Sequence, residues 1–183
     1  LYAPAGSFFC LDVQMGDVDG VAGDDLVVTT FTNVYGFLGG SRARFPAAPG
    51  GTAEVSLDLS STPGSGFTNR PDFSLRGKSS GASSFPWDFS LADADGDGIK
   101  DVAVSDNTVS YGGFTGCGEV YVYRGGPTLK GAVPAPDTSP AQLLHTLRYV
   151  IAQNTNFGQV VATMPKPLGV TDPADWLIVG TGS

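Results

Sequence analysis

The chain has 183 residues, which is enough to bury the core of one domain. Glycine (26 residues) and proline (13 residues) are abundant, and this composition favours an all-β protein with many turns. The net charge of −8 argues against nucleic acid as a partner, and no apolar run is long enough for insertion into a membrane.

Two acidic segments share one pattern, the first at residues 17–28 and the second at residues 93–104, and they align without gaps. The second is the richer in carboxylates, with aspartate at alternate positions and an interruption at Ile99. Its ligand positions are Asp93, Asp95, Asp97, Ile99 and Asp101. Clustered carboxylates repel one another unless a cation is present, and hard oxygen donors in this number suit Ca²⁺. We expect a strong calcium site of four side chains and the Ile99 backbone carbonyl, with an acidic solvated turn as the alternative.

The first segment offers fewer carboxylates in the same arrangement. Its aligned positions are Asp17, Asp19, Val21, Gly23 and Asp25. Val21 stands where the second segment has Asp97, so one carboxylate is missing. We therefore expect a weaker Ca²⁺ site, completed by a water molecule or by the neighbouring Asp24.

These loops differ from an EF-hand, which needs an acidic residue at position twelve and a helix on each side. Position twelve of the second loop is Val104, and residues 87–92 and 102–105 are short apolar or alternating runs. The pattern therefore predicts a calcium loop within a β-hairpin.

The repeat extends beyond the loops. Strand signals in the second unit lie near residues 86–92, 102–106, 118–124 and 143–149, and four short strands per repeat are typical of a β-propeller blade. Residues 141–149 have some helical character, but the alignment predicts a strand at their end. A third copy at Asp175 to Val179 lacks the upstream aspartates except Asp172, so no metal is expected there. Residues 60–84 are predicted to be a long polar loop.

At this level the sequence resembles the FG-GAP repeats of integrin α-chain propellers and related extracellular propellers. Three segments carry the resemblance: Phe157-Gly158, residues 93–101 and residues 118–123. Phe9-Cys10 and Phe85-Pro86 depart from the aromatic-glycine start, and residues 104–106 and 179–181 replace the Gly-Ala-Pro that is common in the family. The resemblance implies a calcium-stabilised propeller outside the cytosol, used for adhesion or for binding a ligand, and does not imply which ligand.

The expected organisation is a single partial propeller over residues 1–183, with blade 1 at about 9–77, blade 2 at about 85–149 and half of blade 3 at 157–183. Two and a half blades cannot close a ring. The remaining blades are expected from other segments of a longer parent protein or from another chain, with self-association as an alternative. The start at Leu1 and the lack of a visible signal peptide suggest a piece excised from a longer polypeptide.

Two cysteines, Cys10 and Cys117, are expected in adjacent blades at the face opposite the calcium turns. A disulfide and two free thiols both remain open, because the sequence fixes no connectivity.

Catalytic signatures are not found. There is no nucleophile elbow, phosphate-binding loop or zinc-ligand set, and the one histidine, His145, falls on a predicted strand. Tyr121 and Tyr123 are expected to pack between blades. In a glycine-rich loop, Tyr111 and Phe114 are the candidate contacts for a protein or glycan ligand, and Trp87 approaches the same face unless it is buried.

The sequence thus favours a non-catalytic, extracellular or cell-surface calcium-binding module for adhesion or ligand binding. Two alternatives remain: an accessory propeller region of a secreted hydrolase or lyase whose catalytic residues lie elsewhere, and a structural subunit of a surface assembly.

Overall fold

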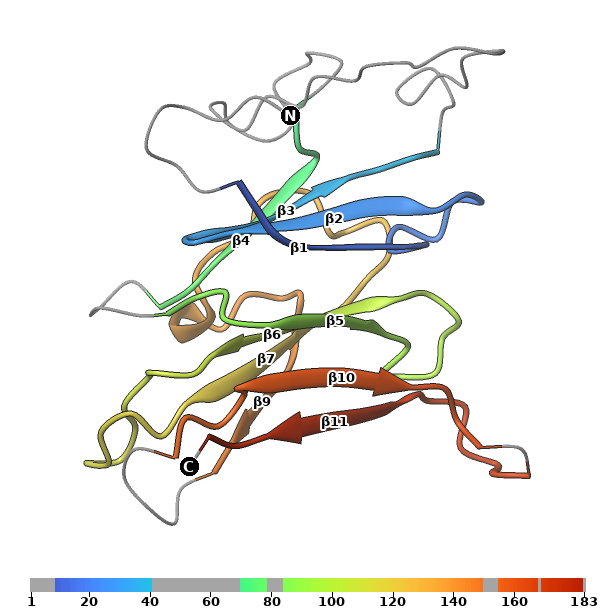
Figure 1. Ribbon diagram of the computed structural model, residues 1–183. Helices are drawn as coiled ribbons and strands as arrows, with labels where there is room; N and C mark the ends of the chain where they lie inside the picture. Colours follow the sequence, from blue (N-terminus) through green and yellow to red (C-terminus); the bar gives the residue numbers. More distant parts are fainter. Residues whose placement is uncertain (1–8, 41–69, 79–83, 150–154, 168, 183) are drawn as a thin grey trace.

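The computed structural model describes residues 9–40, 70–78, 84–149, 155–167 and 169–182 (Figure 1). The described part is all-β, with a single-turn 3₁₀ helix at Pro136–Thr138. It contains no helix with the length and apolar character that a membrane span requires. The predicted all-β class is confirmed, and the sheets do not close on one another.

The first sheet is built from the N-terminal repeat and one short strand from further along the chain. Its strands are β1 (Phe9–Gly16), β2 (Asp25–Thr30), β3 (Asn33–Phe37), β4 (Phe73–Arg76) and β8 (Gly131–Ala132), in the order β1-β2-β3-β4-β8. Strand β4 lies inside the segment predicted as a polar loop, so that prediction is wrong for these residues. The physical reason is that Phe73 and Leu75 alternate with Ser74 and Arg76 and bury their side chains against the second sheet.

The second sheet has the four antiparallel strands that the sequence predicted. These are β5 (Phe89–Ala92), β6 (Asp101–Asp106), β7 (Glu119–Tyr123) and β9 (Leu143–Arg148), in the order β5-β6-β7-β9. The segment that ends at residue 149 therefore forms a strand rather than a helix. The third sheet is the hairpin of β10 (Val160–Met164) and β11 (Trp176–Gly180).

The three sheets lie in layers in chain order, and the first strands of successive sheets contact one another (Figure 1). The side-chain amide of Gln14 on β1 makes two hydrogen bonds with the backbone of β5, as a peptide group of a neighbouring strand would. It donates to the carbonyl oxygen of Phe89 (2.9 Å) and accepts from the N–H of Leu91 (3.0 Å) on β5. On the other side of β5, Ser90 Oγ and Thr163 Oγ1 of β10 are hydrogen-bonded. These side-chain bonds fix the register between layers.

The main core fills the space between the first two sheets. Its largest members are Tyr121, Tyr123, Phe73, Phe85 and Phe89, all nearly or fully buried. The prediction that Tyr121 and Tyr123 pack between sheets is confirmed. A smaller cluster, which includes Val120 and Val161, joins the second sheet to the β10–β11 hairpin. Each buried phenylalanine side chain contributes roughly 1.5–3 kcal/mol to folding.

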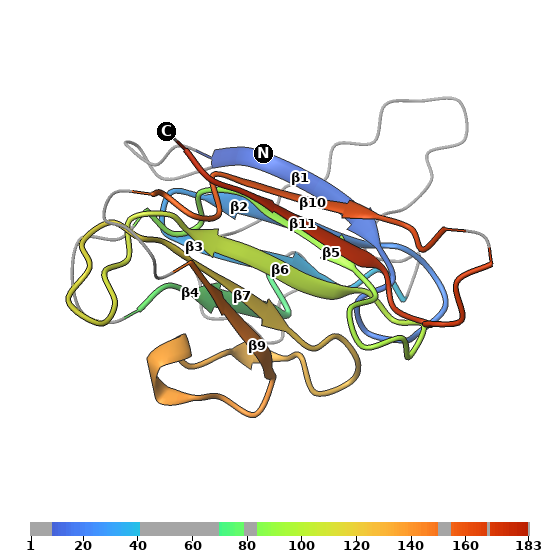
Figure 2. The ribbon, with the colours of Figure 1, turned by 90° about the horizontal axis from the view of Figure 1, so that it is seen from below.

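Strand direction gathers the aspartate turns at one end of the molecule. The turns β1–β2, β5–β6 and β10–β11 lie together in Figure 2, at the ends of the first strands. The turns β2–β3 and β6–β7 lie at the opposite end. The repeat thus places the two candidate cation loops side by side.

Candidate metal centres

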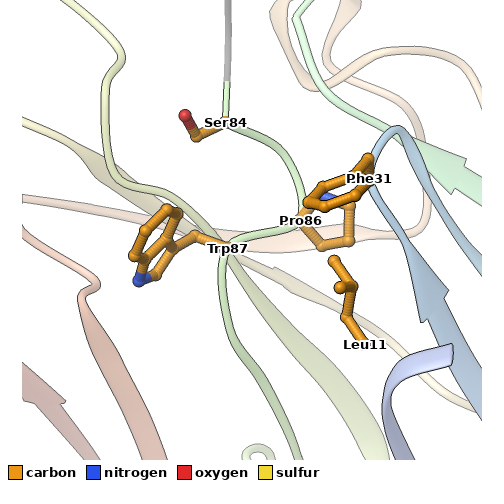
Figure 3. A pocket seen from close by; sticks show the side chains of 5 residues that line it. All are labelled: Leu11, Phe31, Ser84, Pro86 and Trp87. Carbon is orange, nitrogen blue, oxygen red and sulfur yellow. The ribbon is translucent and has the colours of Figure 1, made fainter. Parts of the chain in front are cut away.

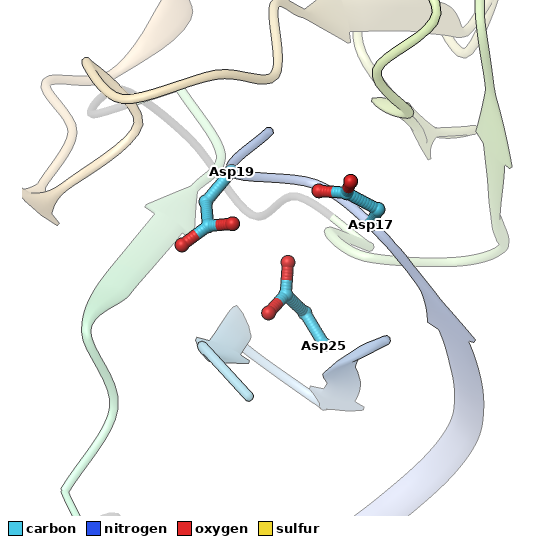
Figure 4. A group of neighbouring side chains, drawn as sticks. All are labelled: Asp17, Asp19 and Asp25. Atoms are coloured by element: carbon cyan, nitrogen blue, oxygen red, sulfur yellow. The ribbon is translucent and has the colours of Figure 1, made fainter. Parts of the chain in front are cut away.

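The first loop brings Asp17, Asp19 and Asp25 together. Each offers a carboxylate oxygen, and these oxygen atoms lie within 4.8 Å of one another (Figure 4). Asp19 and Asp25 are buried, whereas Val21 and Gly23 are exposed in the same turn. The N–H of Val21 donates to Asp19 Oδ1 (2.8 Å), so the backbone folds around the carboxylates. Three of the positions predicted for the first site, those of Asp17, Asp19 and Asp25, therefore lie close together.

The second loop repeats the arrangement with Asp93, Asp95 and Asp101, again within 4.8 Å. Asp97 is exposed and lies outside this group of three, and its Oδ1 accepts the N–H of Ile99 (2.8 Å). Gly20 and Gly96, at equivalent positions, have φ of 78° and 79°, a region that side chains rarely adopt. The two loops therefore share the turn at this glycine. They diverge after it, because the next residue with positive φ is Gly98 in the second loop but Gly23, which aligns with Ile99, in the first.

The closing aspartates, Asp25 and Asp101, make matching hydrogen bonds. Asp25 accepts the N–H groups of Val18 (2.8 Å) and Gly39 (2.6 Å). Asp101 accepts those of Ala94 and Gly125, both at 2.8 Å. Each carboxylate thus ties its own loop to the segment that follows the third strand of its sheet.

The electrostatics of both loops favour a cation. Burial raises the pKa of Asp25, and the nearby charges of Asp19 and Asp17 raise it further, against the lowering effect of the backbone N–H groups. Burial likewise raises the pKa of Asp101, with Asp95 and Asp97 adding to the effect. A cation among these groups would relieve both penalties.

A further observation identifies an unused ligand atom. Asp93 Oδ1 is buried and, within the described part of the chain, has no hydrogen-bond partner. A buried carboxylate oxygen left unpaired is costly, and coordination by a cation would satisfy it. The donor set of carboxylates therefore fits a hard divalent ion.

The two loops differ in one neighbouring side chain. Arg124 pairs with Asp95 Oδ2 at 3.0 Å, at the rim of the second loop. Gly125, which follows Arg124, donates its N–H to Asp101, and Gly39, which follows Leu38, donates its N–H to Asp25. Leu38 therefore occupies in the first loop the position that Arg124 has in the second. The second loop thus has a positively charged side chain paired with one of its carboxylates, and the first loop has an uncharged leucine at that position.

The third repeat contributes Asp175 to the second loop. Asp175 Oδ2 accepts the N–H of Asp93 (3.0 Å) and pairs with Lys100 Nζ (2.6 Å), and the N–H of Asp175 donates to the carbonyl of Asp93 (2.7 Å). Burial opposes ionisation of Asp175, but the Lys100 and Asp93 bonds outweigh it and lower its pKa. Asp175 therefore holds both ends of the second loop.

At the opposite end of the second sheet lies a buried carboxylate that the sequence did not single out as a site. Glu119, fully buried, pairs with Lys78 and Arg148 and accepts a hydrogen bond from Tyr121 Oη (2.7 Å). Burial alone would raise the pKa of Glu119, but these partners together lower it. The signal in the sequence was one acidic residue opening an otherwise apolar buried strand.

The predicted ligand contacts lie at this same end. Tyr111 and Phe114 pair through two backbone hydrogen bonds of 3.0 Å, and the Arg148 guanidinium stacks 4.1 Å from the Tyr111 ring centroid. Trp87 is 50% exposed, so the alternative that it is buried is wrong.

A pocket of about 390 Å³ lies beside Trp87. The described residues that line it are Leu11, Phe31, Ser84, Pro86 and Trp87 (Figure 3). In this view Phe31, Pro86 and Leu11 group together, and Trp87 points to the other side of the chain. Tyr111 and Phe114 are not among the described residues that line this pocket.

Cys117 is a buried free thiol whose Sγ lies 3.4 Å from the carbonyl oxygen of Val109. The side chain of Cys10 falls outside the described residues, as do residues 1–8 at the start of the chain.

No family model matches the chain, and a search of curated proteins finds no significant match.

Proposed function

We propose that this chain is a calcium-binding segment of an extracellular β-propeller of the FG-GAP type, which binds a protein or glycan ligand without catalysis. The observation that carries the proposal is the duplication of one acidic loop. In consecutive repeats, three carboxylates converge within 4.8 Å and the closing aspartate makes the same two backbone bonds. A solvated acidic turn would not require this arrangement twice.

Calcium fits the donors better than the common alternatives. Carboxylate and carbonyl oxygens are hard ligands, and the loops contain no histidine or cysteine, which zinc prefers. Asp93, Asp95 and Asp101 would hold the ion in the second loop, with Asp97 and the Ile99 carbonyl completing the set. Asp17, Asp19 and Asp25 would do so in the first. Bound Ca²⁺ supplies positive charge that neutralises the converging carboxylates.

The proposed role of the ion is structural. Because unfolding separates the carboxylates, Ca²⁺ binds the folded chain preferentially and stabilises it. Extracellular calcium modules commonly bind with dissociation constants of about 10⁻⁴–10⁻³ M, which suits a location outside the cytosol.

Titration calorimetry and thermal unfolding test this proposal. We expect saturable binding of CaCl₂ and a melting temperature that rises with Ca²⁺ and falls with EDTA. Excess Ca²⁺ at about 100 times the dissociation constant would add about 2.7 kcal/mol to the free energy of unfolding. Asp137→Asn replaces an exposed acidic residue outside both loops and is the control; its melting temperature should change with Ca²⁺ and with EDTA by as much as that of wild type. A chain that binds no Ca²⁺ and melts identically in EDTA would contradict the proposal.

Exposed apolar faces at the two ends of the stack support the partial-propeller proposal. On the β10–β11 hairpin the exposed side chains are Val160, Met164, Trp176 and Ile178, and Met164 lies directly opposite Trp176. On β1 they are Val13 and Met15, whereas the exposed Leu11 lines the pocket beside Trp87. Each internal face of the stack is covered by the next sheet. We therefore propose that further blades cover the exposed apolar faces of β1 and of the β10–β11 hairpin. Sedimentation velocity checks this: adding flanking parent sequence should remove concentration-dependent association, whereas unchanged association would oppose it.

The end opposite the cation loops is the proposed ligand face. Its pocket beside Trp87 offers half-exposed aromatic and aliphatic side chains on a framework fixed by the buried Glu119 cluster. A glycan array and a pull-down with extracellular proteins, each compared with Phe31→Ala, would test this face. Binding that is unchanged in Phe31→Ala would place the ligand elsewhere.

A further inference from the structure

The second cation loop contacts the first one directly. The N–H of Lys100 donates to the carbonyl oxygen of Asp17 at 2.8 Å. The side chain of Ile99 packs over Gly20, since a Cβ added to that glycine would lie 2.7 Å from Ile99 Cδ1. Nearby, the N–H of Gly126 donates to the carbonyl of Val18 (2.8 Å). The first loop is therefore held by Ile99 and Lys100 of the second loop and by Gly126, which follows β7.

The same peptide group serves both loops. The Ile99 carbonyl is a proposed ligand in the second loop, and it belongs to the planar unit whose N–H is that of Lys100. This N–H reaches Asp17, whose own carboxylate is a proposed ligand in the first loop. Ile99 is further fixed by its N–H bond to Asp97 Oδ1 (2.8 Å). Because a peptide unit is rigid, orienting its carbonyl also orients its N–H.

The contact recurs at the next junction in the stack. There the N–H of Asp175 donates to the carbonyl of Asp93 at 2.7 Å, and a Cβ on Gly96 would lie 2.4 Å from Pro173. Asp93 and Gly96 occupy in the second loop the positions of Asp17 and Gly20 in the first. Each loop is thus closed by the repeat that follows it, which is a feature of the fold rather than an isolated contact.

We propose that the two loops bind Ca²⁺ with positive cooperativity, transmitted by the peptide unit between Ile99 and Lys100. The inference rests on the proposed function. Filling the second loop fixes Ile99, which fixes the Lys100 N–H and so orders Asp17 for the first loop. By linkage, filling the first loop strengthens binding in the second by the same factor. Mutual repulsion of the two ions opposes this, but it is unaffected by replacing an uncharged side chain.

Calorimetric titration with CaCl₂ tests the coupling in full-length chains. One protein carries Asp95→Asn and Asp97→Asn, which leaves only the first loop; another carries Asp17→Asn and Asp19→Asn, which leaves only the second. Each variant is compared with wild type. The titrations of all three proteins are then repeated with the added substitution Ile99→Gly. This substitution retains the carbonyl group of residue 99 and the Lys100 N–H but gives the backbone more conformational freedom. Ile99→Ala provides a milder second variant, and thermal unfolding checks that every protein is folded.

In wild type we expect the first loop to bind at least about fivefold more tightly than in the protein that retains this loop alone. In the Ile99→Gly background this ratio should fall towards one, with Ile99→Ala between. Two independent sites in wild type, or a ratio that survives Ile99→Gly, would overturn the coupling and leave the proposed function intact. The absence of Ca²⁺ binding in every protein would overturn both.

Discussion

Asp25 and Asp101 occupy the same position in two different sheets and make the same pair of hydrogen bonds. Each is fully buried, and each accepts one N–H from its own loop and one from a glycine after the third strand, Gly39 or Gly125. Each of these carboxylates thus has a structural role besides its proposed role as a ligand. This separates the structural aspartates from those that would act as ligands alone.

In EDTA, Asp101→Asn should therefore lower the free energy of unfolding more than Asp97→Asn does. Asparagine offers one oxygen in place of two, so Asp101→Asn leaves a buried N–H poorly satisfied and should lower the free energy of unfolding by about 1–2 kcal/mol. Asp97 is exposed, and its replacement should change stability by less than about 0.5 kcal/mol. Both variants should lose calcium-dependent stabilisation of the second loop. Urea unfolding in EDTA and in CaCl₂ measures this, and equal losses in EDTA would refute the distinction.

Arg124→Leu should strengthen Ca²⁺ binding at the second loop. Arg124 pairs with Asp95 and competes with the ion, whereas Leu38 takes its place at the first loop. Because the guanidinium is half exposed, we expect a gain of only about two- to fivefold in affinity by calorimetry. Lys130→Leu, which removes the same charge from an exposed position elsewhere, is the matched control. A weaker or unchanged affinity in Arg124→Leu would show that Arg124 does not compete.

Asp175→Asn should weaken binding at the second loop although Asp175 is not a ligand. The substitution leaves the Lys100 ammonium uncompensated beside the loop and loosens the bonds to Asp93. We expect an affinity about three- to tenfold lower, a loss of roughly 0.7–1.4 kcal/mol. Asp172→Asn, an exposed aspartate on the same connection, should leave the affinity unchanged. An equal effect of both substitutions would point to general electrostatics rather than to this contact.

Glu119→Gln should be destabilising in a pH-dependent manner. Although burial opposes ionisation, Lys78, Arg148 and Tyr121 lower the pKa of Glu119 in the folded chain below its unfolded value. The stabilisation is therefore present above the unfolded pKa, near 4.5, and is lost as pH falls through the lower folded pKa. At neutral pH we expect a loss of about 2–4 kcal/mol, less than for fully buried partners because Lys78 and Arg148 are partly exposed.

Chemical unfolding from pH 7 to pH 3 checks this expectation. The difference between wild type and Glu119→Gln should shrink below about pH 4.5, because other carboxylates titrate alike in both proteins. A difference that stays constant over this range would show that the charge of Glu119 contributes nothing beyond its shape.

Much of the secondary structure followed from local pattern. Strands β5, β6, β7 and β9 lie within a few residues of their predicted positions, because alternation and turn residues are local signals. Strand β4 was missed as part of a polar loop, since four residues between Asp72 and Gly77 give too short a pattern. Strand β8 was missed for the same reason, and its pairing with β4 depends on a partner distant in sequence.

By itself the sequence determined the all-β class, the repeat and the two groups of aspartates, because spacing along a strand and a glycine turn dictates which carboxylates converge. Only the tertiary structure decided that Arg124 pairs with Asp95, that Asp175 clamps the second loop, and that Lys78 and Arg148 meet at Glu119. These contacts join different repeats, or residues of one sheet that are distant in sequence. Their geometry depends on how the layers stack, and no local pattern encodes that.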